Sequence, residues 1–354
     1  MSAESVALLG YGRFGRALGQ LLAEAGIPHQ AHDPGADVPR EYRVDSLSEL
    51  TEGAAFIVLA VPVPHMRRVL LELRPQLGGG QVVFDVGSVK VRPALAMSEI
   101  LGSEIPWCAT HPLFGPTSLA LAERPLRVVL CPAPAHPGAA ERVRALYDRI
   151  GCEVVEQSAE NHDRIMAHTH ALTFFIAKGM IDAGAGTQEP FAPPSFQAIS
   201  RTIETVRSDG GHLFSAIARD NPFAAEARKE LVQALASIDR ALDAQSAQEA
   251  EGLPEPTGFA IPDLGERSPE LKQTREHIDA IDQSIVRLLA QRAQLQQRAA
   301  QAKAALGAPV LDAAREADLL AARCKWASEL KLDVEGTANV FRAILTMSRR
   351  GQRT

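Results

Sequence analysis

The chain has 354 residues, of which 46% are hydrophobic and 23% are charged, a composition typical of soluble globular proteins with two or three domains. Its formal net charge of −6 at pH 7 gives no electrostatic support to a nucleic-acid partner. No stretch approaches the roughly twenty apolar residues of a membrane span, and the N-terminus lacks the pattern of a signal peptide. The four cysteines have neither paired nor metal-type spacing, so we expect a cytoplasmic protein.

The first predicted strand leads directly into a glycine-rich turn. Residues 5–9, which are apolar from Val6 onward, are typical of a buried parallel strand, and a GxGxxG pattern formed by Gly10, Gly12 and Gly15 follows. A helix is predicted for residues 17–25. The glycines allow a tight turn and close approach of a pyrophosphate, to which the helix N-terminus offers amide donors. The alternative is a glycine turn without a ligand, and the flanking strand and helix favour the nucleotide site.

A carboxylate follows the second predicted strand, which covers residues 27–32. Asp33 lies about twenty residues beyond the motif, where a carboxylate accepts a hydrogen bond from a ribose 2′-hydroxyl group. The same charge would repel the 2′-phosphate of NADP. The sequence therefore predicts NAD as the cofactor.

Further strands alternate with helices and are predicted at residues 54–61, 81–86, 127–131 and 153–155. This alternation is typical of a doubly wound α/β nucleotide-binding domain, which we expect over residues 1–162. Two polar stretches follow in it, Asp85-Val-Gly-Ser88-Val-Lys90 and Thr110-His111-Pro-Leu-Phe-Gly115. Together with the glycine motif, they resemble the prephenate dehydrogenase family over residues 1 to about 245.

This resemblance implies that His111 is the catalytic base that acts on the ring hydroxyl of the substrate, and that Ser88 hydrogen-bonds the substrate and His111. A histidine suits this task because its unperturbed pKa lies near working pH. Hydride would pass to the nicotinamide as carbon dioxide leaves. The alternative for His111 is a structural histidine in a turn before a proline. His162, His168 and His170 are equally well explained as structural residues, since their spacing does not fit a metal site.

The region 163–250 is rich in alanine and predicted to be helical, and the resemblance implies a dimerisation and substrate domain there. The family places a substrate-binding arginine in this region, but the matching position here is Glu204. Arg201 and Arg207 lie one turn to either side, and we take Arg207 as the candidate. A second histidine of the family is replaced by Phe174. These departures leave open whether the substrate is prephenate or its amino analogue arogenate.

Residues 251–267 are rich in glycine and proline and are predicted to form a linker. From Leu271 onward, apolar residues recur at steps of three and four, as on one face of an amphipathic helix. Arg292 interrupts this predicted buried face, where a guanidinium is costly unless an anion meets it. At about 100° per residue, Lys303 points within roughly 20° of Arg292. Arg275 points roughly 100° away, and we expect it to face a second subunit.

A glycine and proline break ends this helix, and two further helices are predicted after it. Asp312 stands where a helix N-cap would, and Glu316 follows it by four positions. Ser348 and Gln352, again four apart, close the last helix. The alternative is a solvated three-helix hairpin with ordinary surface charges, and it explains the interruption at Arg292 poorly.

Residues 268–354 resemble the all-helical chorismate mutases, which form three-helix domains and intertwined dimers. The resemblance implies that Arg292 and Arg275 of the partner subunit bind the two carboxylates of chorismate. Lys303 and Gln352 would hydrogen-bond its ether oxygen. The other implied positions are Arg315 near the carboxylates, Glu316 at the ring hydroxyl, and Asp312 and Ser348 in the polar lining.

These observations predict a cytoplasmic homodimer of tyrosine biosynthesis with two activities. A mutase would rearrange chorismate to prephenate, and an NAD-dependent dehydrogenase would convert prephenate to 4-hydroxyphenylpyruvate. One alternative is a dehydrogenase that uses arogenate. Another is a dehydrogenase-like domain without turnover that senses a nucleotide or tyrosine and regulates the mutase. No metal, nucleic-acid partner or membrane association is expected.

Overall fold

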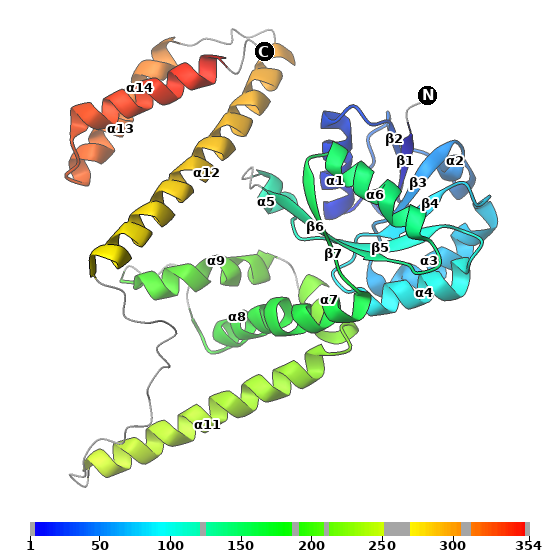
Figure 1. The fold of residues 1–354 in the computed structure, drawn as a ribbon, viewed down its shortest axis with the longest axis horizontal. Helices are drawn as coiled ribbons and strands as arrows, with labels where there is room; N and C mark the ends of the chain where they lie inside the picture. The colour runs from blue at the N-terminus through cyan, green and yellow to red at the C-terminus, as the bar shows by residue number, and fades with distance from the viewer. Residues whose placement is uncertain are drawn as a thin grey trace. The chain divides into compact units, whose positions relative to one another are not determined.

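The computed structural model describes residues 4–120, 125–185, 191–208, 212–250, 270–305 and 313–350. Its two compact units are residues 1–116 with 125–260, and residues 117–124 with 261–354 (Figure 1). The first unit combines a sheet with helices, and the second is helical. In the described part of the chain, no helix has the length and apolar character that crossing a membrane requires.

A seven-stranded sheet in the order β2-β1-β3-β4-β5-β6-β7 forms the centre of the N-terminal unit. Its strands are β1 (Ser5–Leu9), β2 (His29–His32), β3 (Ala54–Leu59), β4 (Val82–Asp85), β5 (Trp107–Pro112), β6 (Leu126–Pro132) and β7 (Cys152–Glu156). Neighbouring strands run parallel, except that β5 and β6 are antiparallel. The predicted doubly wound α/β domain is thereby confirmed.

The sequence pattern did not predict β5, the strand that carries His111. Each of its six residues is buried, so the strand shows no alternation of polar and apolar positions. It pairs with β4 such that Ala109 lies beside Asp85, and His111 therefore lies just beyond the carboxyl end of β4. In parallel α/β sheets this is the edge at which ligands bind.

Helices cover both faces of the sheet, namely α1 (Arg13–Glu24), α2 (Leu47–Thr51), α3 (Val63–Leu73), α4 (Val91–Leu101) and α6 (Pro137–Arg149), and the short helix α5 (Pro116–Ala120) follows β5 in the sequence. On one face, Leu70 of α3 and Met97 of α4 are buried in a cluster with Leu59 of the sheet. On the other face, Tyr147 of α6 meets Phe84 edge-on, with ring centroids 5.9 Å apart. Each such burial stabilises the fold by roughly 1.5–3 kcal/mol relative to exposure, so the site rests on a well-packed platform.

Helices continue through the rest of the N-terminal unit. They are α7 (Ala159–Met166), the π-helical turn η2 (Ala167–Ala171), α8 (Leu172–Asp182), α9 (Pro194–Ser208), α10 (His212–Ser215), a second π-helical turn η3 (Ala216–Asp220) and α11 (Ala224–Ala250). Phe174, Ile203 and Ile217 form a second small core among them. The helical character predicted for this region is confirmed in its described residues.

The C-terminal unit consists of α12 (Glu270–Ala305), α13 (Ala313–Glu329) and α14 (Val334–Arg350), as the three-helix prediction expects. α13 and α14 pack closely, and Ala327 and Leu345 are buried in this unit. The two helices are joined by a turn at Lys331, whose φ of 57° lies in the left-handed region.

The apolar stripe of α12 is largely exposed in the single chain. Ile278, Ile281, Ile285 and Leu288 are 48–62% exposed. The prediction that this stripe is buried is therefore wrong for one chain by itself. The reason is length, because α13 and α14 have 17 residues each and α12 has 36.

Candidate functional site

The glycine turn between β1 and α1 has the geometry of a nucleotide site. Gly10 has a φ of +104°, and a Cβ there would lie 2.5 Å from the carbonyl oxygen of Ala60. A Cβ on Gly15 would lie 2.4 Å from the carbonyl oxygen of Gly10, so helix and strand pack too closely for a side chain. A Cβ on Gly12 would meet no described atom within 4 Å. The turn is thus open at Gly12, where a pyrophosphate would approach the backbone.

Asp33 connects the end of β2 to this turn. Its Oδ2 accepts a hydrogen bond from the backbone N–H of Tyr11 at 2.7 Å, and its Oδ1 accepts one from Gly35 at 2.8 Å. Each carboxylate oxygen offers two lone pairs, so both can still accept a hydrogen bond from a ribose hydroxyl. These residues therefore fit a dinucleotide whose ribose is unphosphorylated.

A buried ion pair between Asp85 and Lys90 connects the polar loop after β4 to β5. Lys90 Nζ donates to Asp85 Oδ2 and to the carbonyl oxygen of Thr110, and both charged side chains are fully buried. Asp85 also accepts the N–H groups of Gly87 and Thr110 at 2.8 and 3.2 Å. Burial raises the pKa of Asp85, and the Lys90 ammonium opposes that shift. Because each charge compensates the other, the pair holds the loop that contains Ser88 in a fixed position.

His111 sits at this edge with only 4% of its surface exposed. Its Nδ1 lies 2.9 Å from Nε2 of His162, and Nδ1 of His162 lies 2.8 Å from Asp163 Oδ1. Burial, and then the electrostatic influence of His162, Lys90 and His170, lower the pKa of His111 well below its ordinary value. His111 is therefore neutral near pH 7, the form that a general base requires.

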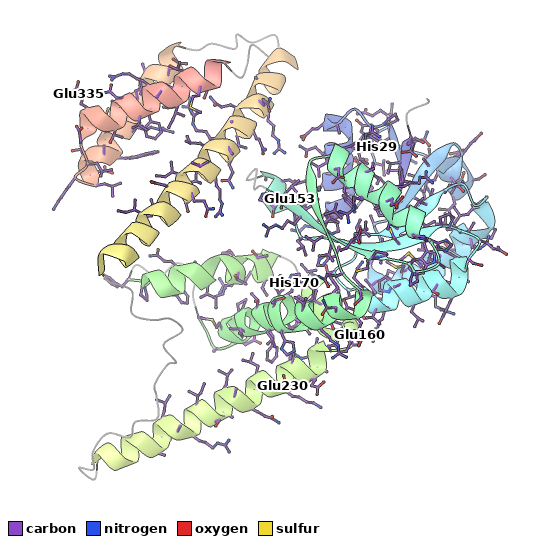
Figure 2. The ribbon with its side chains drawn as sticks, viewed as in Figure 1. His29, Glu153, Glu160, His170, Glu230 and Glu335 are labelled. Atoms are coloured by element: carbon purple, nitrogen blue, oxygen red, sulfur yellow. The ribbon has the colours of Figure 1, made fainter. Side chains whose placement is uncertain are left out.

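Sequence reasoning assigned no function to His162 or His170, yet both lie against His111. His170 is labelled in Figure 2. Its ring is stacked on that of His111, with centroids 6.2 Å apart. His170 belongs to η2, and π-helical turns of this kind recur at functional sites. The sequence feature that could have indicated this role is the adjacent pair His162 and Asp163. Its function depends on a contact with a residue about fifty positions away, which the sequence pattern does not show.

Three other residues considered in the sequence analysis are Ser88, His168 and Phe174. Ser88 is half-buried on the loop after β4, and no hydrogen bond joins it to His111 among the described residues. His168 is exposed, and Phe174 meets the ring of His170 edge-on at 5.0 Å. The role of Ser88 toward a substrate stays a prediction.

The candidate Arg207 lies exposed on α9. Its Nη2 donates to the carbonyl oxygen of Ala185 at 3.3 Å. Glu204, on the same helix, is also exposed. The side chain of Arg201 lies outside the described residues. Substrate binding by Arg207 therefore stays a prediction.

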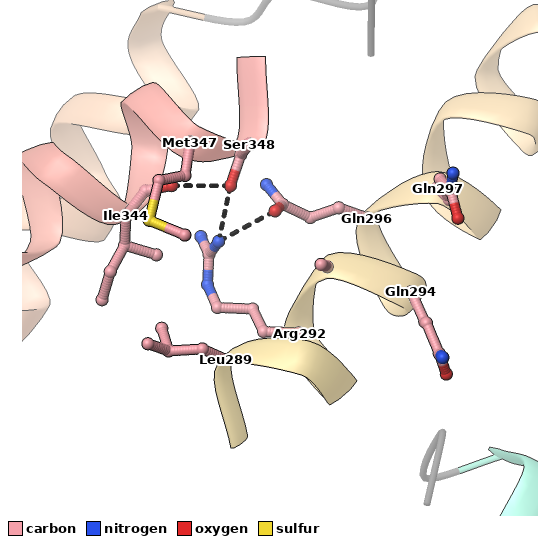
Figure 3. Close-up of a pocket in the computed structure, with 9 residues that line it drawn as sticks. Leu289, Arg292, Gln294, Gln296, Gln297, Ile344, Met347 and Ser348 are labelled. Atoms are coloured by element: carbon pink, nitrogen blue, oxygen red, sulfur yellow. Dashed lines mark hydrogen bonds between the residues drawn. The ribbon is translucent and has the colours of Figure 1, made fainter. Parts of the chain in front are cut away.

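A second candidate site is a pocket of about 200 Å³ between α12 and α14 (Figure 3). Arg292 Nη1 donates to Ser348 Oγ and to Gln296 Oε1, each at 2.9 Å, and Ser348 Oγ donates to the carbonyl oxygen of Ile344 at 2.8 Å. Apolar side chains from both helices complete its lining, namely Leu289, Ala293, Ile344 and Met347. The structure thus brings the predicted Arg292 and Ser348 together across 56 positions of sequence.

Burial, and then the nearby Arg323, lower the pKa of Arg292 from its ordinary value. Two cations are thus gathered at this end of the helical unit, which favours an anionic ligand. Sequence reasoning missed Arg323, whose guanidinium lies over the rings of Trp326 and Phe341 at 4.6 and 5.7 Å. An arginine on a helix does not by itself indicate a binding site, because arginines are equally common at solvent-exposed positions of helices.

The remaining predicted mutase residues are only partly described. Arg315 is exposed and Glu316 is half-buried on α13. Arg275 and Lys303 lie on α12, whose continuous helix has the spacing that the prediction assumed, but their side chains are outside the described residues. Asp312 and Gln352 lie wholly outside the described residues. The roles of these six residues stay predictions.

Comparison with known proteins identifies both units. The family model of the prephenate dehydrogenase nucleotide-binding domain matches residues 31–156, and that of chorismate mutase type II matches residues 274–353. A probable arogenate/prephenate dehydrogenase of Methanocaldococcus jannaschii is 28% identical over 54% of this chain and 45% of its own length. The chloroplastic arogenate dehydrogenase 2 of Arabidopsis thaliana is 26% identical over 68% of this chain and 70% of its own length.

Solved structures share the fold. Prephenate dehydrogenase from A. aeolicus, in complex with hydroxyphenyl propionate and NAD+, aligns with a TM-score of 0.52 at 18% identity, over 80% of this chain and 99% of that one. The chain spans between about half and two thirds of the length of the two curated relatives. The chain thus joins an N-terminal nucleotide-binding domain of the prephenate dehydrogenase family to a C-terminal chorismate mutase domain of type II.

Proposed function

We propose that this chain catalyses two consecutive reactions, the rearrangement of chorismate to prephenate and the NAD-dependent oxidative decarboxylation of prephenate. The observation that carries the proposal is the buried His111, hydrogen-bonded to His162 at the ligand-binding edge of the nucleotide domain, in a chain that also has a mutase domain. The product of the mutase reaction is the substrate of the dehydrogenase reaction. The two domains therefore form a chemically coherent pair.

The C-terminal pocket suits a reaction that needs only positioning. Chorismate rearranges without a nucleophile, metal or proton transfer once its carboxylates and ring are held in one folded conformer. Arg292 presents a planar fork of donors that matches a carboxylate, between the apolar side chains of Leu289 and Met347. We expect Lys303 and Gln352 to donate to the ether oxygen as negative charge grows there.

In the N-terminal unit, His111 would take the proton of the ring hydroxyl. A nicotinamide cofactor bound at the glycine turn supplies the hydride acceptor. As the hydroxyl proton passes to Nε2 of His111, the carbinol carbon would become a carbonyl carbon by giving up hydride, carbon dioxide would leave, and the proton on His111 would return to the resulting phenolate oxygen. The electrons of the broken carbon–carbon bond make the ring aromatic, which drives the step. Because His111 is neutral near pH 7, it can accept this proton without prior deprotonation.

The proposal is tested by supplying chorismate and NAD to the purified protein and following prephenate and NADH separately. We expect prephenate to form first and NADH to follow. A parallel reaction with NADP tests the cofactor. Prephenate accumulation without reduction of either cofactor would contradict the dehydrogenase activity and favour the alternative of a nucleotide-sensing domain that regulates the mutase.

Arogenate is the second candidate substrate of the N-terminal unit. Two observations favour it, the Glu204 that replaces the expected arginine and the similarity to proteins named as arogenate dehydrogenases. Arogenate carries an amino group where prephenate carries a keto group, and a carboxylate can pair with that ammonium. Comparing kcat/KM for the two substrates decides between them. A ratio above about ten in either direction corresponds to about 1.4 kcal/mol of discrimination.

Asp33 should set the choice of cofactor. We expect Asp33→Ser to raise KM for NAD about tenfold and to improve the use of NADP, because a charged hydrogen-bond acceptor of the ribose and a source of repulsion are both removed. Asp37→Ser is the matched control, since it removes the same charge from an exposed position on the same loop. Initial rates at varied NAD and NADP measure the effect. An unchanged ratio of NAD to NADP efficiency would contradict the assignment.

We also propose that the functional form is a homodimer. The exposed stripe of α12 and a second one on α11, formed by Val232, Leu235, Ile238 and Leu242, are the support. Contiguous apolar surfaces of this kind are typical of protein interfaces. Sedimentation should give twice the mass of one chain. A monomer with full mutase activity would contradict this proposal.

A further inference from the structure

A hydrogen-bonded chain of three buried side chains lies behind the proposed catalytic base. His162 connects Asp163 to His111 through bonds of 2.8 and 2.9 Å. The exposed fractions of Asp163, His162 and His111 are 0%, 1% and 4%, so water does not compete for these bonds. Within the described residues His111 makes no other hydrogen bond, which leaves its Nε2 available to a substrate.

Asp163 anchors this chain as an acceptor. Its Oδ1 accepts the backbone N–H of Lys90 at 2.7 Å, and its Oδ2 accepts that of Val91 at 2.8 Å. Both donors belong to the start of α4, where backbone amides favour a negative charge. A carboxylate can only accept, so the hydrogen between Asp163 and His162 belongs to Nδ1 of His162.

The position of the next hydrogen follows from this one. A neutral imidazole carries a hydrogen on one nitrogen only, so Nε2 of His162 is an acceptor. The hydrogen between the two rings then belongs to Nδ1 of His111, and Nε2 of His111 holds a lone pair. We infer that Asp163 and His162 are positioning residues that keep His111 in the tautomer able to take a proton at Nε2. This inference rests on the proposed dehydrogenase function.

The same chain stabilises the charge that the reaction creates. When the substrate O–H bond breaks and the Nε2–H bond forms, His111 becomes positive and its hydrogen bond to His162 becomes charge-assisted. Burial, and then His162, Lys90 at the start of α4 and His170 on η2, disfavour that positive charge. Asp163, reached through His162, opposes them. Without the hydrogen bonds from Asp163 through His162, His111 would be a poorer base and its hydrogen would be free to occupy Nε2.

Two substitutions of His162 separate this role from simple packing. In His162→Gln the side-chain oxygen reaches the position of Nε2 and can accept from His111, whereas the shorter amide of His162→Asn reaches only the position of Nδ1. We expect His162→Asn to lower kcat for prephenate oxidation about 100-fold, with KM changed less than about threefold, because the tautomer is no longer held. His162→Gln should stay within about tenfold of the unsubstituted protein.

His168→Asn is the matched control, because His168 is an exposed histidine of the same helical segment. It should leave kcat unchanged. Mutase turnover of each variant, measured with chorismate in the same preparation, serves as an internal check on protein concentration and folding of the other unit. Circular dichroism and thermal unfolding show whether the N-terminal unit keeps its structure.

The tautomer can also be observed directly. With isotope-labelled histidine, two-dimensional NMR of the full chain should show the hydrogen of His111 on Nδ1, and a mixture of tautomers in His162→Asn. A hydrogen on Nε2 of His111 in the unsubstituted protein overturns the inference. So does an equal loss of kcat in folded Gln and Asn variants. If the unsubstituted protein oxidises neither prephenate nor arogenate, the proposed function fails, while the NMR measurement still decides the tautomer.

Discussion

Replacing His111 with asparagine is expected to lower kcat for prephenate oxidation by about 1,000-fold, within the range of roughly 10²–10⁴ that general bases contribute. The substitution removes the Nε2 atom that would accept the proton of the substrate, while the shorter amide still offers a donor to His162. The production of NADH from supplied prephenate measures the effect. The mutase activity of the same variant should be unchanged, because its pocket lies in the other unit.

The pH profile supplies a second measurement on His111. Burial first, and then the charges of its neighbours, lower its pKa well below its ordinary value of 6.5. The neutral base therefore persists as the pH falls through 6.5, and kcat/KM should decrease only as the pH passes through the lowered pKa. An acid limb centred at or above pH 7, or an asparagine variant that keeps a tenth of the activity, would contradict the assignment.

Replacing Arg292 with alanine is expected to lower kcat/KM for chorismate rearrangement by about 1,000-fold, or about 4 kcal/mol of transition-state stabilisation. Its guanidinium donates to Ser348 across the two helices and lines a pocket with apolar walls. Arg292→Lys keeps the charge but loses the planar fork, so it should recover only part of the activity. Depletion of chorismate measures both variants.

Two controls make this result interpretable. Arg287→Ala removes an exposed arginine from the same helix and should leave mutase activity unchanged. Oxidation of supplied prephenate should be unaffected in all three variants. Because Arg292 also joins α12 to α14 through Ser348, unfolding of each variant must be measured. A folded Arg292→Ala protein with full mutase activity would remove the basis for placing the site in this pocket.

The features that could be predicted from sequence are those in which neighbouring residues carry the information. The glycine turn is one, because β1, the three glycines and α1 follow each other within twenty residues. Asp33 is another, since it closes the next strand and reaches back to Tyr11. The 36-residue α12 is a third, because its periodic apolar positions extend over many turns.

The features that could not be predicted depend on contacts between distant segments. β5 has no alternating pattern of its own, since it lies between β4 and β6 within the sheet and its residues are buried on both faces. The stripe of α12 was expected to be buried, but whether it is covered depends on what packs against it, and a periodic pattern does not specify that. The position of Arg323 on α13 does not by itself indicate a binding role. Only its closeness to Arg292 in the folded unit makes it a candidate for anion binding.

By itself, the sequence determined that this protein has a nucleotide-binding α/β unit and a helical unit with a cation on an apolar face. These properties follow from local propensity and periodicity, which each short segment expresses independently. Only the tertiary structure decided that His162, 51 positions from His111, is its hydrogen-bond partner, and that Asp163 is held by the start of α4. The physical reason is that strand order and helix docking bring these groups together, and each hydrogen bond depends on distances that no short segment specifies.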